Sequence, residues 1–317
     1  MRVGNAFAML AGIATVLAPV AAQSTVAGAT GGQSSAHAPA HSSSISHSHV
    51  PGSSSGTSDL YFIKTEDTGS GDVEVHSATA ASDYRSGIDV ATRFSESDAE
   101  NPNGGWWQMV GSTLYFIKTR NTGSGYVEIH TATAASGYQS GIDVVTRFGE
   151  ADASGEGIWH MDGPNLYFIR TDHEDAGAFV DVFSATAASG YKSGTDETTR
   201  LSEVDAYSGN YQMSDGNLYF LKLIDVGYVQ VHSATASSGF KSGTNELSRF
   251  AHPTEPRDWW VMSGPNLYMI KTIGSGSHDV EVHSATAASD YKSGIDVATR
   301  FSEADAFDGW WQIGATS

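Results

Sequence analysis

The feature that most constrains the fold is a five-fold internal repeat. Each unit contains an LYFIK-like segment, a Gly-rich turn, a run similar to VEVHSATAAS, a TRF-like segment and a closing aromatic pair. Periods of ~20–50 residues are typical of solenoids, propellers and repeat arrays, so the repeat is stronger evidence about the fold than any local motif. The LYFIK-like segment begins five times, at intervals of 54, 52, 52 and 49 residues, at Leu60, Leu114, Leu166, Leu218 and Leu267.

The units have the pattern of β-strands. Residues 60–64 and 73–76 alternate so that successive side chains sort to opposite faces, as in a half-buried strand. The sequences VGST, DGPN, SDGN and SGPN between the closing aromatic segments and the LYFIK segments are typical of tight turns. No unit has an apolar stripe at helical spacing. The sequence therefore predicts three or four short antiparallel strands in each unit.

The regularity of the terminal units favours a closed ring over an open row. A solenoid exposes both ends and needs atypical capping repeats, whereas the first and last units here look like the others. Five blades lie within the usual range of ~4–8 for propellers. The last strand, around Trp310, can also pair with the first, from Asp59, and close the ring. We expect an all-β fold, a single five-bladed β-propeller over residues 59–317.

The order of an aromatic strand, a Gly turn, an LY-containing strand and a second exposed strand resembles the five-bladed tachylectin-type propeller lectins. It is similar, more loosely, to the fungal and bacterial fucose-binding propeller lectins. The resemblance covers all five units and rests on the layout of the repeat. It implies one shallow sugar site per blade or between adjacent blades, without catalysis, and it does not indicate which sugar is bound.

The first 58 residues predict two further segments. Residues 1–22 contain Arg2, an apolar run and a small-residue end, the pattern of a secretory signal peptide. The apolar run is shorter than the ~20 residues of a membrane span. Residues 23–58 are rich in Ser, Gly and His and lack aromatic residues, which predicts a disordered linker. We therefore expect a secreted, extracellular protein that is not inserted in a membrane after signal cleavage.

Composition excludes several classes of function. The formal net charge is −19, which opposes binding to nucleic acids or anionic lipids. There is no Cys, so disulfides, thiolate metal sites and thiol catalysis are excluded. The P-loop and HExxH motifs do not occur in the sequence. We expect neither enzymatic activity nor a cofactor or metal site.

The closing aromatic pair supplies the first candidate site residues. Its second position is aromatic in every unit, as inter-blade packing demands. Its first position varies, as Trp106, Ile158, Asn210, Trp259 and Trp310. Trp106, Trp259 and Trp310 are therefore candidates for stacking on sugar rings, and a packing role at the surface is the alternative.

An arginine recurs before Phe or Leu in all five units. Its planar fork of donors suits a carboxylate or a pair of vicinal hydroxyls. The structural alternative is a salt bridge to the Asp four residues upstream in the same unit, such as Asp89 for Arg93. The arginine candidates for ligand contact are Arg93, Arg147, Arg249 and Arg300, and we expect Arg200 in unit three to contribute least.

A glutamate and a histidine share one strand face in three units. Glu74, Glu128 and Glu281 each precede a His by two residues. Repetition of the pair argues against general acid–base catalysis, because an active site is normally built once. The carboxylates are candidates for binding sugar hydroxyls, with polar surface and pairing to a cross-strand Lys or Arg as the alternative.

Together these patterns predict a secreted, lectin-like protein that binds glycans or glycoconjugates through several weak sites. The main alternative is a non-catalytic structural or host-interaction scaffold that binds proteins, and a glycan-acting hydrolase ranks third. Units one and five keep every element, so we expect them to bind most tightly.

Overall fold

The computed structural model describes residues 58–99, 105–154, 157–171, 179–202, 209–223, 227–251, 258–307 and 309–315. The expected signal peptide and nearly all of the expected linker lie outside these residues. Within the described ranges, none of the helices has the length and apolar character needed to cross a membrane.

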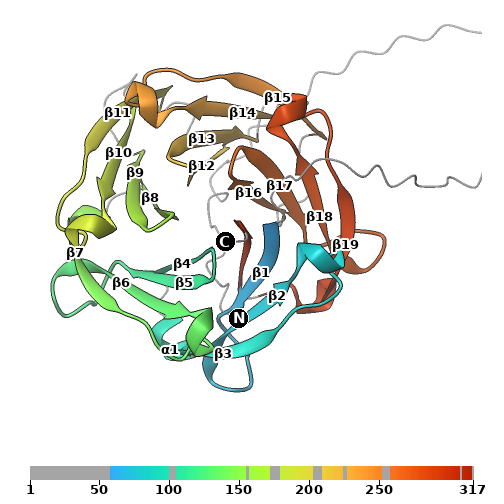
Figure 1. Cartoon of the computed structure of the whole chain (residues 1–317), viewed down its shortest axis with the longest axis horizontal. Helices are drawn as coiled ribbons and strands as arrows, with labels where there is room; N and C mark the ends of the chain where they lie inside the picture. The colour runs from blue at the N-terminus through green and yellow to red at the C-terminus, as the bar shows by residue number, and fades with distance from the viewer. Residues whose placement is uncertain are drawn as a thin grey trace, which may run out of the picture. The chain divides into compact units, whose positions relative to one another are not determined.

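Five antiparallel four-stranded sheets form the blades of a β-propeller, as predicted (Figure 1). From the innermost strand outward, blade 1 contains β20 (Gly309–Ala315), β1 (Ser58–Lys64), β2 (Asp72–Ala78) and β3 (Asp89–Ser95). Blade 2 contains β4 (Gly105–Val110), β5 (Thr113–Lys118), β6 (Tyr126–Thr133) and β7 (Asp143–Gly149). Blade 3 contains β8 (Gly157–Asp162), β9 (Asn165–Arg170), β10 (Phe179–Ala185) and β11 (Asp196–Ser202).

Blade 4 contains β12 (Gly209–Ser214), β13 (Asn217–Lys222), β14 (Tyr228–Ala234) and β15 (Asn245–Ala251). Blade 5 contains β16 (Trp259–Ser263), β17 (Asn266–Lys271), β18 (Asp279–Ala285) and β19 (Asp296–Ser302). The helical segments in the described ranges are single turns. They are α1 (Glu96–Ala99) and the 3-10 turns Ala80–Ser82, Ala134–Ser136, Asp152–Ser154, Ala187–Ser189, Ala236–Ser238, Ala287–Ser289 and Glu303–Asp305.

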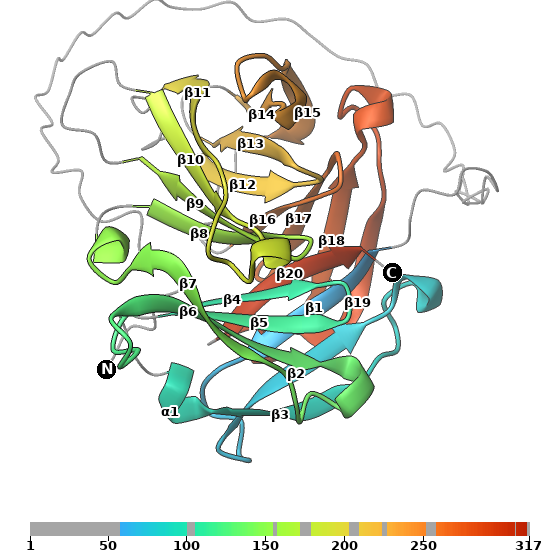
Figure 2. The same cartoon turned by 60° about the vertical axis from the view of Figure 1, so that its left-hand side comes forward.

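The ring closes through the predicted pairing of its first and last strands. Strand β20 is antiparallel to β1, with Trp311 opposite Phe62 and Ile313 opposite Leu60 (Figure 2). The innermost strands β20, β4, β8, β12 and β16 each contact the next and complete a cycle around the axis. Strand β1 begins at Ser58, one residue before the expected start.

The core lies between the blades. Each of its five hydrophobic clusters combines side chains of neighbouring blades; Trp107 and Phe116 of blade 2, for example, pack with Ile63 and Val75 of blade 1. The rings of Trp107 and Phe116 stack with centroids 4.3 Å apart. The prediction of a packed second aromatic column is confirmed, since all five members are buried: Trp107, Trp159, Tyr211, Trp260 and Trp311.

A loop after the third strand of each blade fastens it to the preceding blade. In blade 1 the 3-10 turn Ala80–Ser82 leads to Tyr84, which has a φ of 61° and a buried ring. Its hydroxyl donates a hydrogen bond to the Ser58 carbonyl at 2.9 Å, and its own carbonyl accepts one from the backbone N–H of Arg300 at 2.9 Å. The loop that follows the SATAAS segment thus links blade 1 to blade 5.

Candidate functional site

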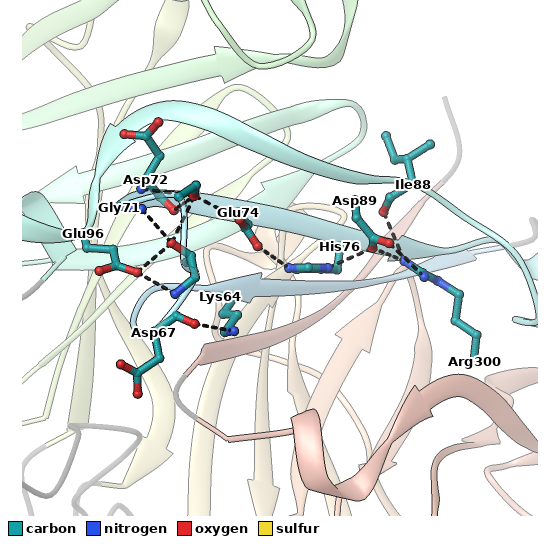
Figure 3. Close-up of polar contacts among 12 residues, drawn as sticks. Lys64, Asp67, Gly71, Asp72, Glu74, His76, Ile88, Asp89, Glu96 and Arg300 are labelled. Atoms are coloured by element: carbon teal, nitrogen blue, oxygen red, sulfur yellow. Dashed lines mark hydrogen bonds and ion pairs between the residues drawn. The ribbon is translucent and has the colours of Figure 1, made fainter.

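The repeated arginines lie on the outermost strands and reach across to the next blade. Arg300 of β19 donates from Nε to the Ser77 carbonyl at 2.8 Å and from Nη2 to the Ile88 carbonyl at 3.1 Å. Its guanidinium also forms a two-pronged ion pair with Asp89, in which Nη1 lies 3.2 Å from Oδ2 (Figure 3). The arginine therefore joins blade 5 to blade 1.

The prediction that each arginine forms a salt bridge within its own unit is wrong. Arg93 pairs with Asp143 of blade 2 and not with Asp89, four residues upstream on its own strand. Residues four apart on an extended strand are separated by ~13 Å, which is too far for a direct bridge. The Asp of the next blade comes within reach only because the blades pack against each other.

A histidine connects this ion pair to the glutamate of the same blade. His76 lies opposite Asp89 in the sheet, with Nδ1 2.8 Å from Asp89 Oδ1 and Nε2 3.1 Å from Glu74 Oε2 (Figure 3). Glu74 also accepts a hydrogen bond from the Ser70 hydroxyl at 2.9 Å. The result is a continuous chain from Arg300 through Asp89 and His76 to Glu74.

We call this arrangement of Arg, Asp, His and Glu a seam cluster. Three seams carry the complete set, and they lie between blades 5 and 1, blades 1 and 2, and blades 4 and 5. Their members are Arg300, Asp89, His76 and Glu74; Arg93, Asp143, His130 and Glu128; and Arg249, Asp296, His283 and Glu281.

The other two seams lack parts of the set. Between blades 2 and 3, Arg147 pairs with Asp196, but Phe183 occupies the His position. Between blades 3 and 4, Arg200 donates to the Asn245 side chain at 2.6 Å, so a hydrogen bond to an amide replaces the Arg–Asp ion pair. The expected cross-strand ion pair is present in blade 3, where Arg170 lies 2.9 Å from Asp181. In blade 1, Lys64 donates instead to the Asp67 carbonyl at 2.7 Å.

Each complete seam cluster is half open to solvent beside an apolar side chain. The Asp89 side chain is 51% exposed and the adjacent Ile88 is 49% exposed. Ile142 and Ile295 occupy the same position in the other two complete seams and are also exposed. The hydrogen bond from Arg300 holds the pKa of Asp89 below its usual value, and that from Arg93 does the same to the pKa of Asp143. Both carboxylates are therefore ionised acceptors at neutral pH.

The tryptophan candidates lie elsewhere. Trp106, Trp259 and Trp310 are on the innermost strands β4, β16 and β20, where the Trp310 ring lies 5.8 Å from that of Trp106 and 6.0 Å from that of Trp259. Adjacent strands are ~4.8 Å apart, so the width of a blade separates these indoles from the arginines on the outermost strands. The structure thus brings the Arg and Glu candidates together and keeps the Trp candidates apart from them.

The exposed isoleucines and the pairing between units were missed in the sequence. A signal was present, because the three units that carry Glu and His also carry Gly-Ile-Asp, as at Ile88 and Asp89, whereas the other two carry Gly-Thr.

Among the described residues, no group of His, Asp and Glu is arranged to hold a metal ion.

No protein-family model matches the chain, and no curated protein sequence matches it. Among solved structures, TolB from Acinetobacter baumannii is similar with a TM-score of 0.38 and 12% identity, over 78% of this chain and 54% of that one. Apo AztD from Citrobacter koseri is similar with a TM-score of 0.31 and 9% identity, over 81% of this chain and 98% of that one. The chain thus spans about half the length of that TolB. Because these scores are low, the fold assignment rests on the geometry described above.

Proposed function

We propose that this protein is a secreted, non-catalytic carbohydrate-binding propeller whose sugar sites are the three complete seam clusters. The observation that supports this is the threefold occurrence of a half-exposed, ionised Asp beside an exposed Ile. Sugars present hydroxyls at their ring edges and C–H groups on their faces, so that a binding site needs polar groups next to apolar surface.

Each member of the cluster has a distinct part in this proposal. The exposed carboxylate, Asp89 in the first seam, accepts hydrogen bonds from sugar hydroxyls, and Ile88 packs against the C–H face. Arg300 and His76 hold the carboxylate in place, because both are already bonded to it. Glu74 fixes the other nitrogen of His76. Three such sites on one molecule can gain ~10²–10⁴ in avidity on a glycan surface, even when each is weak.

Asp89 is poorly suited to act as a general acid. A general acid must carry a proton near the working pH, and the lowered pKa of Asp89 keeps its carboxyl ionised. The same groups are also repeated at three seams, as expected for binding sites and not for a single active site.

A glycan array followed by calorimetry tests this proposal. We expect one class of glycan to bind with about three sites per protein, one for each complete seam cluster. The triple variant Ile88→Ser, Ile142→Ser and Ile295→Ser should lose binding without a change in thermal unfolding, because all three side chains are exposed. Tyr228→Ser, at an exposed residue away from the seams, is the matched control and should bind normally. Normal binding by the triple variant would show that the seams are not the sites.

A protein-binding scaffold is the second candidate, and one observation favours it. Tyr126, Phe179 and Tyr228 begin the third strand of three successive blades and are all about half exposed. Exposed aromatic residues are enriched where proteins bind each other. No binding on the array, together with a protein partner whose binding is lost when these three residues become Ser, would support this alternative.

A further inference from the structure

The seam between blades 3 and 4 keeps the layout of a seam cluster but not its charge. Asn245 lies opposite His232 in the sheet, where a complete seam has Asp opposite His. His232 Nε2 lies 2.9 Å from Gln230 Oε1, and Gln230 takes the position of the Glu. Both carboxylates are therefore replaced by amides of nearly the same size. With His counted as neutral, a complete seam has one Arg against two acids, a net charge of −1, whereas this seam has Arg200 alone, a net charge of +1.

The change from Asp to Asn leaves two hydrogen-bond donors next to each other. Arg200 donates from Nη2 to Asn245 Oδ1 at 2.6 Å and to the Thr244 carbonyl at 2.8 Å. In a complete seam Nη1 is also bonded, as Nη1 of Arg300 is to Asp89 Oδ2 at 3.2 Å (Figure 3). Here Nδ2 takes the place of that second oxygen, because a guanidinium has only donors and must face Oδ1. Among the described residues, Arg200 Nη1 and Asn245 Nδ2 have no acceptor.

Both donors are open to solvent. Asn245 is exposed and Arg200 is partly buried. Neither Nη1 nor Nδ2 is among the buried side-chain atoms that lack a partner in the described part of the chain, so each remains in contact with water. Thr244, which is exposed, stands where the complete seams have Ile. The surface beside the two donors therefore carries a hydroxyl group in place of an apolar side chain.

The charge around Arg200 favours an anion. Burial lowers the pKa of its guanidinium, an effect that a paired carboxylate would oppose, yet an arginine stays charged in proteins. Lys241 of blade 4 adds a second positive charge, since its Nζ donates to the Thr198 carbonyl, two residues before Arg200. Glu197 is directed toward Gly239, with Oε2 3.7 Å from where a Cβ there would lie. The net charge of −19 is spread over the whole chain and is screened beyond ~8 Å at physiological ionic strength.

We propose that this seam is a further sugar site and that it binds an acidic sugar, of the uronic acid type, through its carboxylate. One carboxylate oxygen accepts hydrogen bonds from Arg200 Nη1 and Asn245 Nδ2, and thus replaces the second Asp oxygen of a complete seam. Charge-assisted hydrogen bonds of this kind are about twice as strong as neutral ones. The Thr244 hydroxyl bonds to a hydroxyl of the sugar ring. The inference rests on the proposed function, because the ligand is a sugar, but it concerns a different seam and a ligand of opposite charge preference.

Titration with three small probes tests the proposal by saturation-transfer NMR at pH 7 and constant ionic strength. Glucuronate has both a carboxylate and a sugar ring, glucose has the ring alone, and acetate has the carboxylate alone. The wild type is titrated beside the triple variant Ile88→Ser, Ile142→Ser and Ile295→Ser, in which the complete seams are altered. We expect saturable glucuronate binding of equal affinity in both proteins, with acetate in both and glucose in the triple variant about tenfold weaker. Absence of glucuronate binding, or equal binding of acetate or of glucose in the triple variant, would overturn the proposal.

A single substitution of the same size locates the site. Asn245→Asp restores the carboxylate of a complete seam, so it should occupy Arg200 Nη1, repel glucuronate and abolish its binding. Asn266→Asp is the matched control, because it adds the same charge where blade 1 already carries Asp59, and it should bind glucuronate normally. Retained binding in Asn245→Asp would refute the site, and equal loss in both variants would show an effect of net charge alone. Circular dichroism establishes that both variants are folded.

The two proposals can fail separately. Absence of any hit on the glycan array other than acidic sugars would refute the complete seams as sites, while loss of glucuronate binding in Asn245→Asp would still support the site between blades 3 and 4. Conversely, array binding that depends on Ile88, Ile142 and Ile295, together with no glucuronate binding by the wild type, would refute only the acidic-sugar site.

Discussion

At the scale of single residues, a glycine at the start of an innermost strand packs closely against a phenylalanine of the neighbouring strand. A Cβ on Gly105 would lie 2.1 Å from Cε2 of Phe116, and one on Gly157 would lie 2.3 Å from Cε2 of Phe168. In blade 5 both positions differ, with Asp258 in place of the glycine and Met269 in place of the phenylalanine. The flexible Met side chain leaves room for a Cβ that a rigid ring excludes.

We therefore expect Gly105→Ala to destabilise the protein by about 1–3 kcal/mol through overpacking. Phe116→Met in the same chain should recover part of this loss, since Met occupies the equivalent position in blade 5. Urea unfolding of the wild type, both single variants and the double variant completes the cycle. Strictly additive effects would contradict the proposed fit between the two side chains.

His160 makes stability depend on pH. Burial lowers its pKa to about 4, whereas an unfolded His titrates near ~6.5. Between these values only the unfolded chain binds the proton, so this stabilisation is complete above pH ~6.5 and is lost as the pH falls toward ~4. The loss is at most about 3 kcal/mol, because part of the side chain remains accessible to solvent.

Urea unfolding at pH 7 and pH 4.5 measures this effect. His160→Gln should reduce the difference in unfolding free energy between the two pH values, and His278→Gln, at an exposed histidine, should leave it as in the wild type. An unchanged pH dependence in His160→Gln would show that another group is responsible.

At the scale of structural elements, the outer strand of each blade is held to the next blade by one arginine side chain. Arg93 donates from Nε to the Thr131 carbonyl at 2.8 Å while its other nitrogens engage Asp143. A lysine cannot make both contacts, because it lacks the planar fork. We expect Arg93→Lys to lower the unfolding free energy by about 1–2 kcal/mol.

Chemical denaturation of Arg93→Lys checks this value. Arg120→Lys is the matched control, since Arg120 lies in the connection between β5 and β6 and not at a seam. Equal stability of the two variants would mean that the seam clusters contribute little to holding the blades together.

At the scale of the whole molecule, Ala315 of the last strand and Ser58 of the first strand lie where blade 2 has the two residues of a turn. In blade 2, the two residues Gly111 and Ser112 connect β4 to β5. The register of β20 with β1 places Ala315 and Ser58 at the two equivalent positions. A direct peptide bond between them would therefore complete a two-residue turn of the same length as that of blade 2.

A circular permutant tests this equivalence. Joining residue 315 to Ser58 and opening the chain between Gly111 and Ser112 should give the same propeller, with a melting temperature within a few degrees of that of the wild type. Ala315→Gly should be included, because Gly111 has a φ of 57°. Deletion of residues 309–315 removes β20, leaves the edge of β1 unpaired and should cause unfolding or association, seen by size-exclusion chromatography. A permutant that behaves like the deletion would refute the equivalence of the turns.

The sequence by itself determined the blades and the closure of the ring. Alternation in residues such as Leu60–Lys64 depends on the backbone of one strand, and tight turns such as 162–165 depend on a few adjacent residues. Both can therefore be recognised locally. Because the five units have nearly the same sequence, each should bury the same face of its closing strand. That face carries Trp107 or its equivalent, so the sequence alone assigned this aromatic column to the core.

Only the tertiary structure decided which repeated polar residues meet. Arg93 and Asp89 are near in sequence, yet an extended strand keeps them apart, and packing of the blades gives each arginine the Asp of its neighbour. For the same reason the Trp and Arg columns, which alternate regularly in sequence, lie at opposite edges of each sheet. The distance of a residue from the axis follows from the order of strands in a blade. The partner of an outer strand follows from the rotation between blades. The spacing of residues within one unit contains neither piece of information.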